Sequence, residues 1–167
     1  SSNDSIAVSV DSTKASRGTY SVDVTSLATA QALASRDVFA DRDATSVGRG
    51  TLTLTVGDKV TNVTIDSSND TLQGLANAIN DADAGVSAGV IDTGNGYRLV
   101  LSADETGTAN AVSITVSGDN QGTDTDNQGL SRFAFNGDMD PGAGLEETIT
   151  ATDAVMSING VEVTRAT

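Results

Sequence analysis

The segment Asp66-Ser-Ser-Asn-Asp-Thr-Leu-Gln-Gly-Leu-Ala-Asn-Ala-Ile-Asn80 decides the fold, because it has the periodicity of an amphipathic helix set among strand-like stretches. Its apolar residues follow the i, i+3, i+4, i+7 spacing that forms one stripe along a helix: Leu72, Leu75, Ala76 and Ile79. Asp70, with Gln73 three residues later, forms an imperfect capping box and is the expected N-cap. Gly85 fits the left-handed residue that follows a helix end. We therefore expect one helix whose apolar stripe lies on a β-sheet.

Short segments in which apolar and polar residues alternate surround this helix, and each predicts a strand with one buried face. They comprise residues 6–10, 20–24, 52–56, 86–91, 97–101, 112–116 and 156–163. The apolar parity changes between Val60 and Val63, which predicts a β-bulge near Thr61-Asn62. Periodicity alone leaves residues 27–34 open as helix or strand.

The clearest turn signal is Asn159-Gly160, a pair typical of a two-residue type I′ hairpin. In that register Ile158 faces Val161 and Met156 faces Val163, so these four side chains share one face of the hairpin. Residues 117–129 are acidic, rich in glycine and free of apolar side chains, and we expect a mobile loop there.

Two polar stretches divide the chain, one at residues 41–50 and one at residues 136–144 around the single proline, Pro141. We predict an α+β, predominantly β fold of two small domains built from antiparallel strands, one of which carries the packed amphipathic helix. Residues 48–144 are expected to form an inserted α+β domain, and residues 1–47 with 145–167 a discontinuous β-rich domain. The chain begins and ends abruptly in strand-like sequence, so we expect it to be part of a longer protein.

The charge balance is strongly acidic, with 23 acidic residues against 9 basic ones and a net charge of −14 at pH 7. Such a surface repels phosphate backbones and anionic lipid headgroups, so we expect neither nucleic acid nor a membrane as a partner. Cysteine and histidine are absent, which excludes disulfides, zinc thiolate sites and most nucleophile–base pairs. The sequence has no apolar run of about 18 residues, the length of a membrane span.

Two pairs of adjacent carboxylates, Asp104-Glu105 and Glu146-Glu147, could in principle serve a glycosidase. Adjacent residues of a strand point to opposite faces, however, and two Tyr and three Phe provide few of the aromatic platforms that a sugar site uses. The glycine pairs of Gly48-Arg-Gly50 and Gly94-Asn-Gly96 do not extend to a dinucleotide fingerprint and indicate turns. We therefore assign no catalytic residue and no cofactor, and we do not expect an enzyme.

The segment Asp124-Thr-Asp126-Asn-Gln-Gly129 begins like a calcium-binding loop. Gln128 fills the fifth position acceptably, but Phe135 fills the twelfth, where an EF-type loop requires Glu. We favour a flexible acidic loop and assign no metal ligand. A calcium-stabilised extracellular β module stays a hypothesis, which a melting temperature raised by calcium would support. Chance accounts for the Asn-x-Ser/Thr sequences in a chain of this composition, namely those at Asn3, Asn62 and Asn69.

Four stretches resemble the flagellar hook-associated protein 2 family, whose members cap the bacterial flagellar filament. They are Gly18-Thr-Tyr-Ser-Val-Asp-Val-Thr-Ser-Leu-Ala-Thr-Ala-Gln-Ala-Leu-Ala-Ser35; Gly50-Thr-Leu-Thr-Leu-Thr-Val-Gly57; Thr71-Leu-Gln-Gly-Leu-Ala-Asn-Ala-Ile-Asn80 with Gly96-Tyr-Arg-Leu-Val-Leu101 and Thr106-Gly107 downstream; and Ser157-Ile-Asn-Gly-Val-Glu-Val163. The helix–hairpin unit recurs in other flagellar axial proteins. The four stretches together follow the order of this family across residues 18–163.

The resemblance implies two β-rich head domains and an extended strand at residues 27–34. It also implies a structural function, as the head region of a filament cap at the flagellar tip outside the cell, where the cap supports the assembly of flagellin subunits. The implied partners are flagellin, other copies of the protein in a cap ring, and hook–filament junction proteins. The helical terminal segments that pack such caps against a filament are not in this sequence, so we expect the chain alone to form no robust ring.

The alternative function is an adhesin-like extracellular binding module for host glycan or mucin. The scarcity of aromatic residues argues against strong sugar binding, because rings that stack on sugars are missing. Saturable, specific binding on a glycan array would favour the adhesin, whereas coiled-coil heptads flanking the chain would favour the cap.

Overall fold

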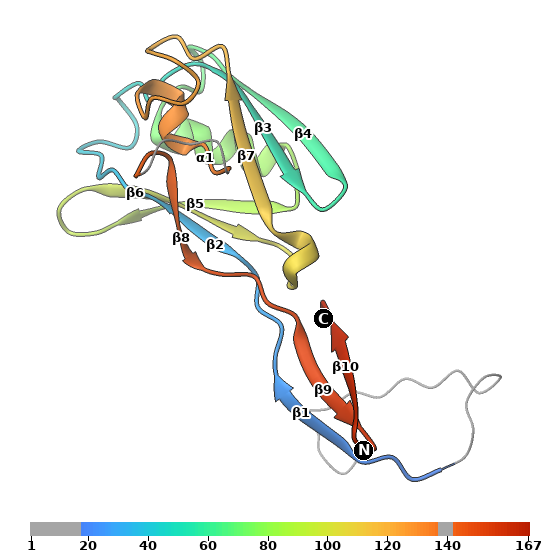
Figure 1. The fold of residues 1–167 in the computed structure, drawn as a ribbon. Coiled ribbons are helices and arrows are strands. Elements are labelled where there is room, and N and C mark those ends of the chain that lie inside the picture. The colour runs from blue at the N-terminus through green and yellow to red at the C-terminus, as the bar shows by residue number, and fades with distance from the viewer. Residues whose placement is uncertain (1–17, 137–141) are drawn as a thin grey trace.

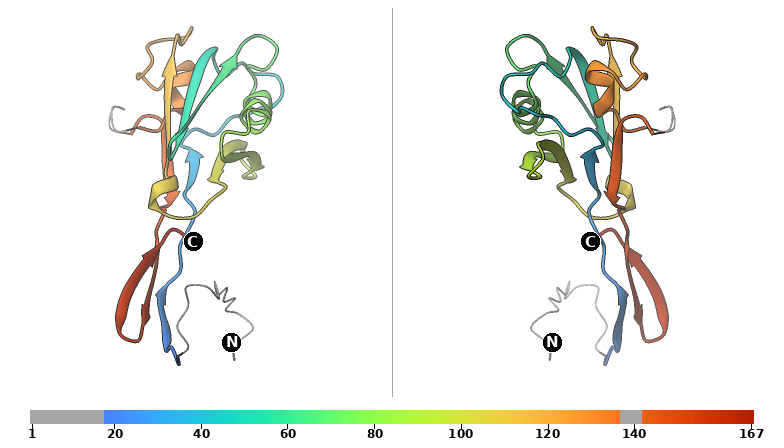
Figure 2. Two further views of the ribbon diagram at one scale, coloured as in Figure 1. Left: turned by 90° about the vertical axis from the view of Figure 1, so that its right-hand side faces the viewer. Right: turned by 90° about the vertical axis from the view of Figure 1, so that its left-hand side faces the viewer.

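The computed structural model describes residues 18–136 and 142–167, which form an elongated molecule (Figure 1). The larger body, residues 29–152, is called the head, and a smaller sheet that extends from one end of it is called the stalk (Figure 2). The strand predicted at residues 6–10, the sequence at Asn3 and the residue Pro141 lie outside the described residues.

The described part of the chain contains one α-helix, two short 3₁₀ helices and ten strands. Their bounds are β1 (Val22–Ser26), β2 (Ala32–Ser35), β3 (Gly50–Val56), β4 (Lys59–Ile65), α1 (Leu72–Asp81), β5 (Val86–Asp92), β6 (Tyr97–Ala103), η1 (Thr108–Asn110), β7 (Val112–Ser117), η2 (Gly129–Phe133), β8 (Leu145–Ile149), β9 (Ala154–Ile158) and β10 (Val161–Arg165). Three antiparallel sheets result, with the orders β1-β9-β10, β5-β6-β2-β8 and β4-β3-β7. The predicted α+β, predominantly β fold is confirmed.

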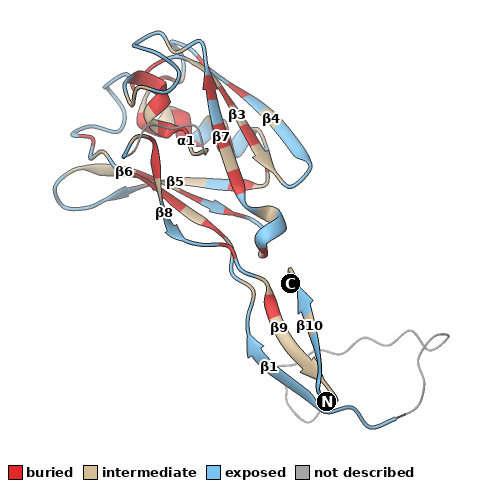
Figure 3. Cartoon of the chain, viewed as in Figure 1, coloured by how far each residue is buried: buried red, intermediate tan, exposed pale blue. Residues whose placement is uncertain are grey.

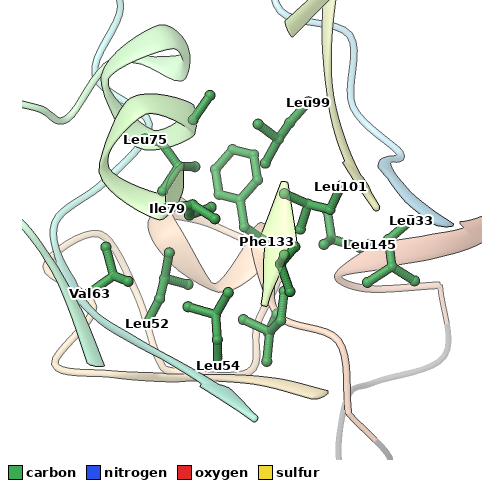
Figure 4. Close-up of a cluster of buried hydrophobic side chains, with 14 of the residues drawn as sticks. Leu33, Leu52, Leu54, Val63, Leu75, Ile79, Leu99, Leu101, Phe133 and Leu145 are labelled. Atoms are coloured by element: carbon green, nitrogen blue, oxygen red, sulfur yellow. The ribbon is translucent and has the colours of Figure 1, made fainter. Parts of the chain in front are cut away.

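The head is built from two sheets that pack their apolar faces into a shared core. Leu52 and Leu54 come from β3 in one sheet, and Leu99 and Leu101 come from β6 in the other (Figure 4). Each of these side chains is at most 3% exposed. Phe133 of η2 completes the core and stacks on a second ring, that of Phe39, at a centroid distance of 5.7 Å.

Helix α1 buries the predicted apolar stripe, because Leu72, Leu75, Ala76 and Ile79 are all buried. Its N-cap is Thr71 rather than the predicted Asp70, since the Thr71 hydroxyl accepts a hydrogen bond from the Gly74 N–H at 3.1 Å. Gly85 follows the helix with a φ of 82°, as the sequence predicts. Both residues at the start of the helix are good caps, and the contacts of Asp70 described below explain why it does not serve as one.

The bulge predicted near Thr61-Asn62 is wrong. The register of β3 with β4 runs without a break from Val56↔Lys59 to Gly50↔Ile65. Val63 is 4% exposed, whereas Val60 is 63% exposed. The parity of the apolar residues changes because Val60 faces solvent beside the β3–β4 turn, and a single exposed valine needs no change of register.

The stalk follows the predicted hairpin register, with Ile158 opposite Val161 and Met156 opposite Val163. Asn159 and Gly160 both have positive φ, 50° and 83°, as a type I′ turn requires. β1 adds to the other edge of β9 as a third strand. The buried face predicted for residues 20–24 is wrong within the described structure, because three side chains on it are exposed (Figure 3): Tyr20, Val22 and Val24.

Residues 27–34 contain no helix. The chain is extended there, with an isolated bridge from Thr29 to Thr152 and then β2, as the family resemblance implies. β2 hydrogen-bonds to both β6 and β8, so strands from residues 1–47 and 145–167 lie in one sheet with strands from residues 48–144. The predicted domain boundaries stay a prediction.

A loop of the head that contains η1 contacts the stalk. The Thr108 N–H donates a hydrogen bond to the Asp153 carboxylate at 2.7 Å, and the neighbouring Gly107 N–H donates one to the carbonyl of Thr29, at the edge of the head, at 3.1 Å. A Cβ on Gly107 would lie 2.5 Å from the Cβ of Ala166, so a glycine is needed where the chain beyond β10 returns to the head.

Candidate interaction surface

The adjacent carboxylates Glu146 and Glu147 lie on opposite faces of β8. Glu146 accepts a hydrogen bond from Arg98 and lies 3.7 Å from the guanidinium of Arg36. The Arg98 hydrogen bond is the main cause that holds the pKa of Glu146 below its usual value, and partial burial opposes it. Glu147 instead accepts a hydrogen bond from the Gln31 amide at 2.5 Å. Two carboxylates on opposite faces of one strand cannot act on the same bond.

The second carboxylate pair is also divided between separate environments. Asp104 follows β6 and accepts a hydrogen bond from the Ser87 hydroxyl at 2.6 Å, whereas Glu105 is exposed in the next loop. Neither pair has the geometry in which two carboxylates flank a glycosidic bond.

Residues 117–129, expected to be a mobile loop, form a closed network of side chain–backbone hydrogen bonds. Asp126 accepts hydrogen bonds from the backbone N–H groups of Thr123 at 2.9 Å and Gln128 at 3.0 Å, and these lower its pKa. Asp119 accepts hydrogen bonds from Gln121 at 3.0 Å and from Ser131 at 2.7 Å, which ties the loop to η2. The aspartates therefore stabilise the loop by replacing missing backbone acceptors.

The segment that begins like a calcium-binding loop also uses its aspartates as hydrogen-bond acceptors for the backbone. Asp124 accepts a hydrogen bond from the Asp119 N–H at 2.9 Å. Phe135, at the twelfth position, pairs its backbone with Ile114 of β7. Within residues 18–136 and 142–167, no group of three or more acidic residues is arranged to hold a metal ion.

Asp70 links the N-terminal end of α1 to the segment before β3. Its carboxylate accepts hydrogen bonds from Arg49 Nε at 2.7 Å and from the Ser46 hydroxyl at 2.9 Å, and only 8% of the residue is exposed. These hydrogen bonds, with Arg49 first, lower the pKa of Asp70 despite its burial. The sequence offers no signal for this contact, because Arg49 and Asp70 are separated by two strands.

The outer face of the sheet β5-β6-β2-β8 carries a shallow depression of about 390 Å³. Small side chains form it, so the backbone of the sheet is accessible to a partner: Ala32, Ser87, Ala88, Gly89, Ser102 and Thr148, with Val100 beside them. Cross-strand pairing places Val100 between Gly89 on β5 and Ala34 on β2. The depression contains no charged side chain.

The basic side chains of the described head are all neutralised. Each lies within 4.0 Å of a carboxylate, in the pairs Arg36–Glu146, Arg42–Asp43, Arg49–Asp70, Lys59–Asp83, Arg98–Glu146 and Arg132–Asp37. The remaining charge of the head surface is negative, which disfavours polyanionic partners. Among the described residues, no helix has the length and apolar character of a membrane-spanning segment.

Comparison with known proteins places this fold among flagellar components. Residues 51–105, which contain β3 to β6 and α1, match the family described as the flagellin hook IN motif. The chain is 37% identical over 169 aligned residues to the B-type flagellar hook-associated protein 2 of Pseudomonas aeruginosa, an alignment that covers 97% of the chain and 35% of that protein. The chain thus spans about a third of the length of this curated relative.

Solved structures of the same kind are similar over nearly the whole chain. The crystal structure of the D2-D3 domains of the flagellar cap protein FliD from Escherichia coli has a TM-score of 0.78 at 32% identity, with 92% of this chain and 77% of that one covered. The crystal structure of FliD from Pseudomonas aeruginosa has a TM-score of 0.75 at 35% identity, with 92% of this chain and 69% of that one covered. Neither the fold nor these similarities support the adhesin-like alternative.

Proposed function

The chain belongs to the flagellar hook-associated protein 2 family of filament-capping proteins, and we propose that it forms the head region of a flagellar cap at the filament tip, outside the cell. The observation that carries the proposal is the match of both parts, head and stalk, to cap-protein structures across 92% of the chain. In this role the chain is structural: the cap would support the insertion of flagellin subunits beneath it. Its partners would be flagellin and other copies of the same protein.

The outer face of the sheet β5-β6-β2-β8 is the surface that we assign to contact with these partners. Its shallow depression is lined by small side chains and contains no charged side chain, so another polypeptide can approach the sheet closely. The acidic residues that surround it on the rest of the head would set the orientation of approach more than the affinity.

A genetic experiment tests the proposal. The gene is deleted, and the strain is complemented with the full-length protein or with full-length Val100→Arg, which places a charge in the depression. Val60→Arg, at an exposed position on β4, is the matched control. We expect the deletion and Val100→Arg to shorten filaments in electron micrographs and to release unpolymerised flagellin into the medium, and we expect Val60→Arg to behave as wild type. Normal filaments in the deletion strain would contradict the cap function, whereas normal filaments with Val100→Arg would contradict only the assigned surface.

The assembly state is tested separately. We expect light scattering to show a ring from the full-length protein and none from the 167-residue chain. A stable ring from the 167-residue chain would contradict the assignment of ring assembly to segments outside it.

The domain organisation stays a proposal with two candidate divisions: the predicted one, with residues 48–144 inserted into residues 1–47 and 145–167, and one at the junction of head and stalk. Pairing of β2 and β8 with β6 supports boundaries closer to the head–stalk junction at Thr29 and Thr152. Limited proteolysis distinguishes the two divisions, because cleavage near the junction, rather than near residues 47 and 145, would release a head that still melts cooperatively.

A further inference from the structure

Three Asn-Gly pairs occur in the chain, and an asparagine that precedes glycine is prone to spontaneous deamidation because glycine has no side chain to block the attack. The pairs are Asn95-Gly96, Asn136-Gly137 and Asn159-Gly160. Gly137 lies outside the described residues, so the first and the last pair are the two with a complete backbone description. Both of their asparagines are exposed in the turn of a β-hairpin, yet the two turns hold them differently.

Deamidation begins when the backbone nitrogen of the glycine attacks Cγ of the asparagine. A bond forms between this nitrogen and Cγ, the Cγ–Nδ2 bond breaks, and Nδ2 leaves as ammonia with the proton that the glycine nitrogen has lost. Water then opens the five-membered succinimide at either carbonyl, which gives an aspartate or an isoaspartyl residue. Ring closure requires the glycine nitrogen to lie on the same side of the Cα–C bond as Cβ of the asparagine, so the local backbone decides whether the reaction can start.

Asn159 is held away from this geometry. Its φ of 50° belongs to the type I′ turn between β9 and β10, and such a turn places the following nitrogen on the side of the Cα–C bond opposite to Cβ. The residue is also fixed to the segment before β1. The Ser21 N–H donates a hydrogen bond to Asn159 Oδ1 at 2.8 Å, and the Asn159 N–H donates one to the Ser21 carbonyl at 2.9 Å. Rotation of Asn159 into the reactive geometry would therefore disrupt the turn and these hydrogen bonds.

Asn95 lies in a less constrained turn, which joins β5 to β6 and projects from the head (Figure 1). Gly94 and Gly96 flank it, with φ values of 83° and 137°, and glycine rotates more freely than any other residue. A hydrogen bond from the Thr93 N–H to the Gly96 carbonyl closes the turn at 2.8 Å. Within the described residues, neither the Asn95 side chain nor the Gly96 N–H takes part in a hydrogen bond, so Asn95 can rotate without breaking one.

We propose that Asn95 is a site of spontaneous deamidation in the folded protein, whereas Asn159 is protected by its turn and by Ser21. The reaction needs only water as a co-reactant and replaces a neutral carboxamide by a carboxylate. The modified protein therefore gains one negative charge at the turn between β5 and β6.

The isoaspartyl product also changes the backbone. It adds one methylene carbon to the main chain directly before Gly96, where a Cβ would already lie 2.6 Å from the Phe39 carbonyl oxygen. Tyr97, the first residue of β6, exchanges two backbone hydrogen bonds with Phe39, at 2.7 and 2.8 Å. A longer main chain at this point displaces Gly96 and weakens the pairing of Tyr97 with Phe39.

Peptide mapping by mass spectrometry of the 167-residue chain tests the proposal, since it reads each asparagine separately. The folded protein is incubated in mildly alkaline buffer, where the amide nitrogen loses its proton more readily, and a second sample is incubated in concentrated urea, where both turns are lost. In the folded protein we expect Asn95 to deamidate at least about 10-fold faster than Asn159, a difference of about 1.4 kcal/mol in activation free energy. In urea we expect similar rates, because only the local sequence then acts.

Two variants test the protection of Asn159. Ser21→Pro removes the N–H that donates to Asn159 Oδ1 and should raise the rate at Asn159 several-fold without changing the rate at Asn95. Ser21→Ala keeps this N–H and is the matched control, which should deamidate like the wild type. Hydrogen exchange of the β9 amides checks that the stalk sheet is still formed in both variants.

Three results would overturn the proposal. The first is a rate at Asn95 in the folded protein that does not exceed the rate at Asn159. The second is a rate at Asn95 at least about 10-fold lower in the folded protein than in urea, which would show that its turn also protects it. The third is an unchanged rate at Asn159 in Ser21→Pro, which would contradict the protection assigned to Ser21.

Discussion

The side-chain carbonyl of Gln31 accepts a hydrogen bond from the backbone N–H of Val112 at 2.6 Å. The amide of the same side chain donates to Glu147 at 2.5 Å, and Gln31 is only 4% exposed. Val112 begins β7 in one sheet of the head and Glu147 lies on β8 in the other. One buried glutamine therefore connects the two sheets at the end of the head that faces the stalk.

Replacement of this glutamine tests the connection. Gln31→Leu leaves the Val112 N–H without an acceptor in a buried site, and we expect the free energy of unfolding in urea to fall by about 1–3 kcal/mol. Gln121→Leu, at an exposed position in the loop 117–129, is the control and should change it by less than about 0.5 kcal/mol. Equal effects of the two substitutions would show that the hydrogen bonds of Gln31 contribute nothing to stability.

The Asp70 network predicts a loss of stability in acid. Hydrogen bonds from Arg49 and Ser46 hold the pKa of Asp70 in the folded protein below its ordinary value of 3.8. A carboxyl group whose pKa is lower in the folded protein than in the unfolded chain contributes to the free energy of unfolding. The full contribution is present well above pH 3.8, and it is lost as the pH falls through the pKa of the folded state. Urea unfolding between pH 6 and pH 2.5 should show that the free energy of unfolding decreases as the pH falls. In Asp70→Asn this decrease should be smaller. Asp58→Asn, in the exposed β3–β4 turn, should leave the slope closer to that of the wild type; no difference between the two variants would contradict the role of Asp70.

Replacement of Gly74 in helix α1 by alanine should destabilise the protein, although this substitution usually stabilises a helix. Alanine stabilises a helix interior relative to glycine by about 1 kcal/mol. A Cβ at position 74 would lie 2.5 Å from the carbonyl oxygen of Asn69, however, so the backbone before α1 would have to move. We expect Gly74→Ala to destabilise the head by about 1–3 kcal/mol in thermal unfolding. Gly89→Ala, whose Cβ would meet Val100 at an ordinary 3.6 Å, should be tolerated; a stabilised Gly74→Ala variant would contradict the close approach.

The two valines of β4 test the register without a bulge. Val63 is buried against the core, so Val63→Ala should lower the free energy of unfolding by roughly 1–3 kcal/mol. Val60 faces solvent, and Val60→Ala should change it by less than about 0.5 kcal/mol. Similar losses at both positions would indicate that Val60 also enters the core and that the strand is irregular.

Local features of the structure were predictable, because neighbouring residues alone specify them. The stripe of α1 and the type I′ turn at Asn159-Gly160 depend on periodicity and on the backbone preferences of asparagine and glycine. The capping residue was less predictable. Asp70 and Thr71 are both good caps, and the distant Arg49 decides the choice by holding the Asp70 carboxylate.

The hydrogen bonds within the loop 117–129 were not predictable for a related reason. Its composition is typical of a mobile segment, and the same aspartates that give it this composition accept hydrogen bonds from backbone N–H groups of the loop. The depression on the outer face of the head sheet has no sequence signal either, since it arises from small residues on four different strands, β5, β6, β2 and β8, brought side by side.

The amino-acid sequence by itself determined the helix α1 and most of the strands, the hairpin register of β9 with β10, and the resemblance to filament-capping proteins. The tertiary structure alone decided that β2 pairs with β6 and β8, that Gln31 joins two sheets, and that the apolar side of β1 faces outward. The physical reason is that the alternation of apolar and polar residues along a strand determines which of its faces is apolar. Whether that face is buried depends on which distant segment packs against it.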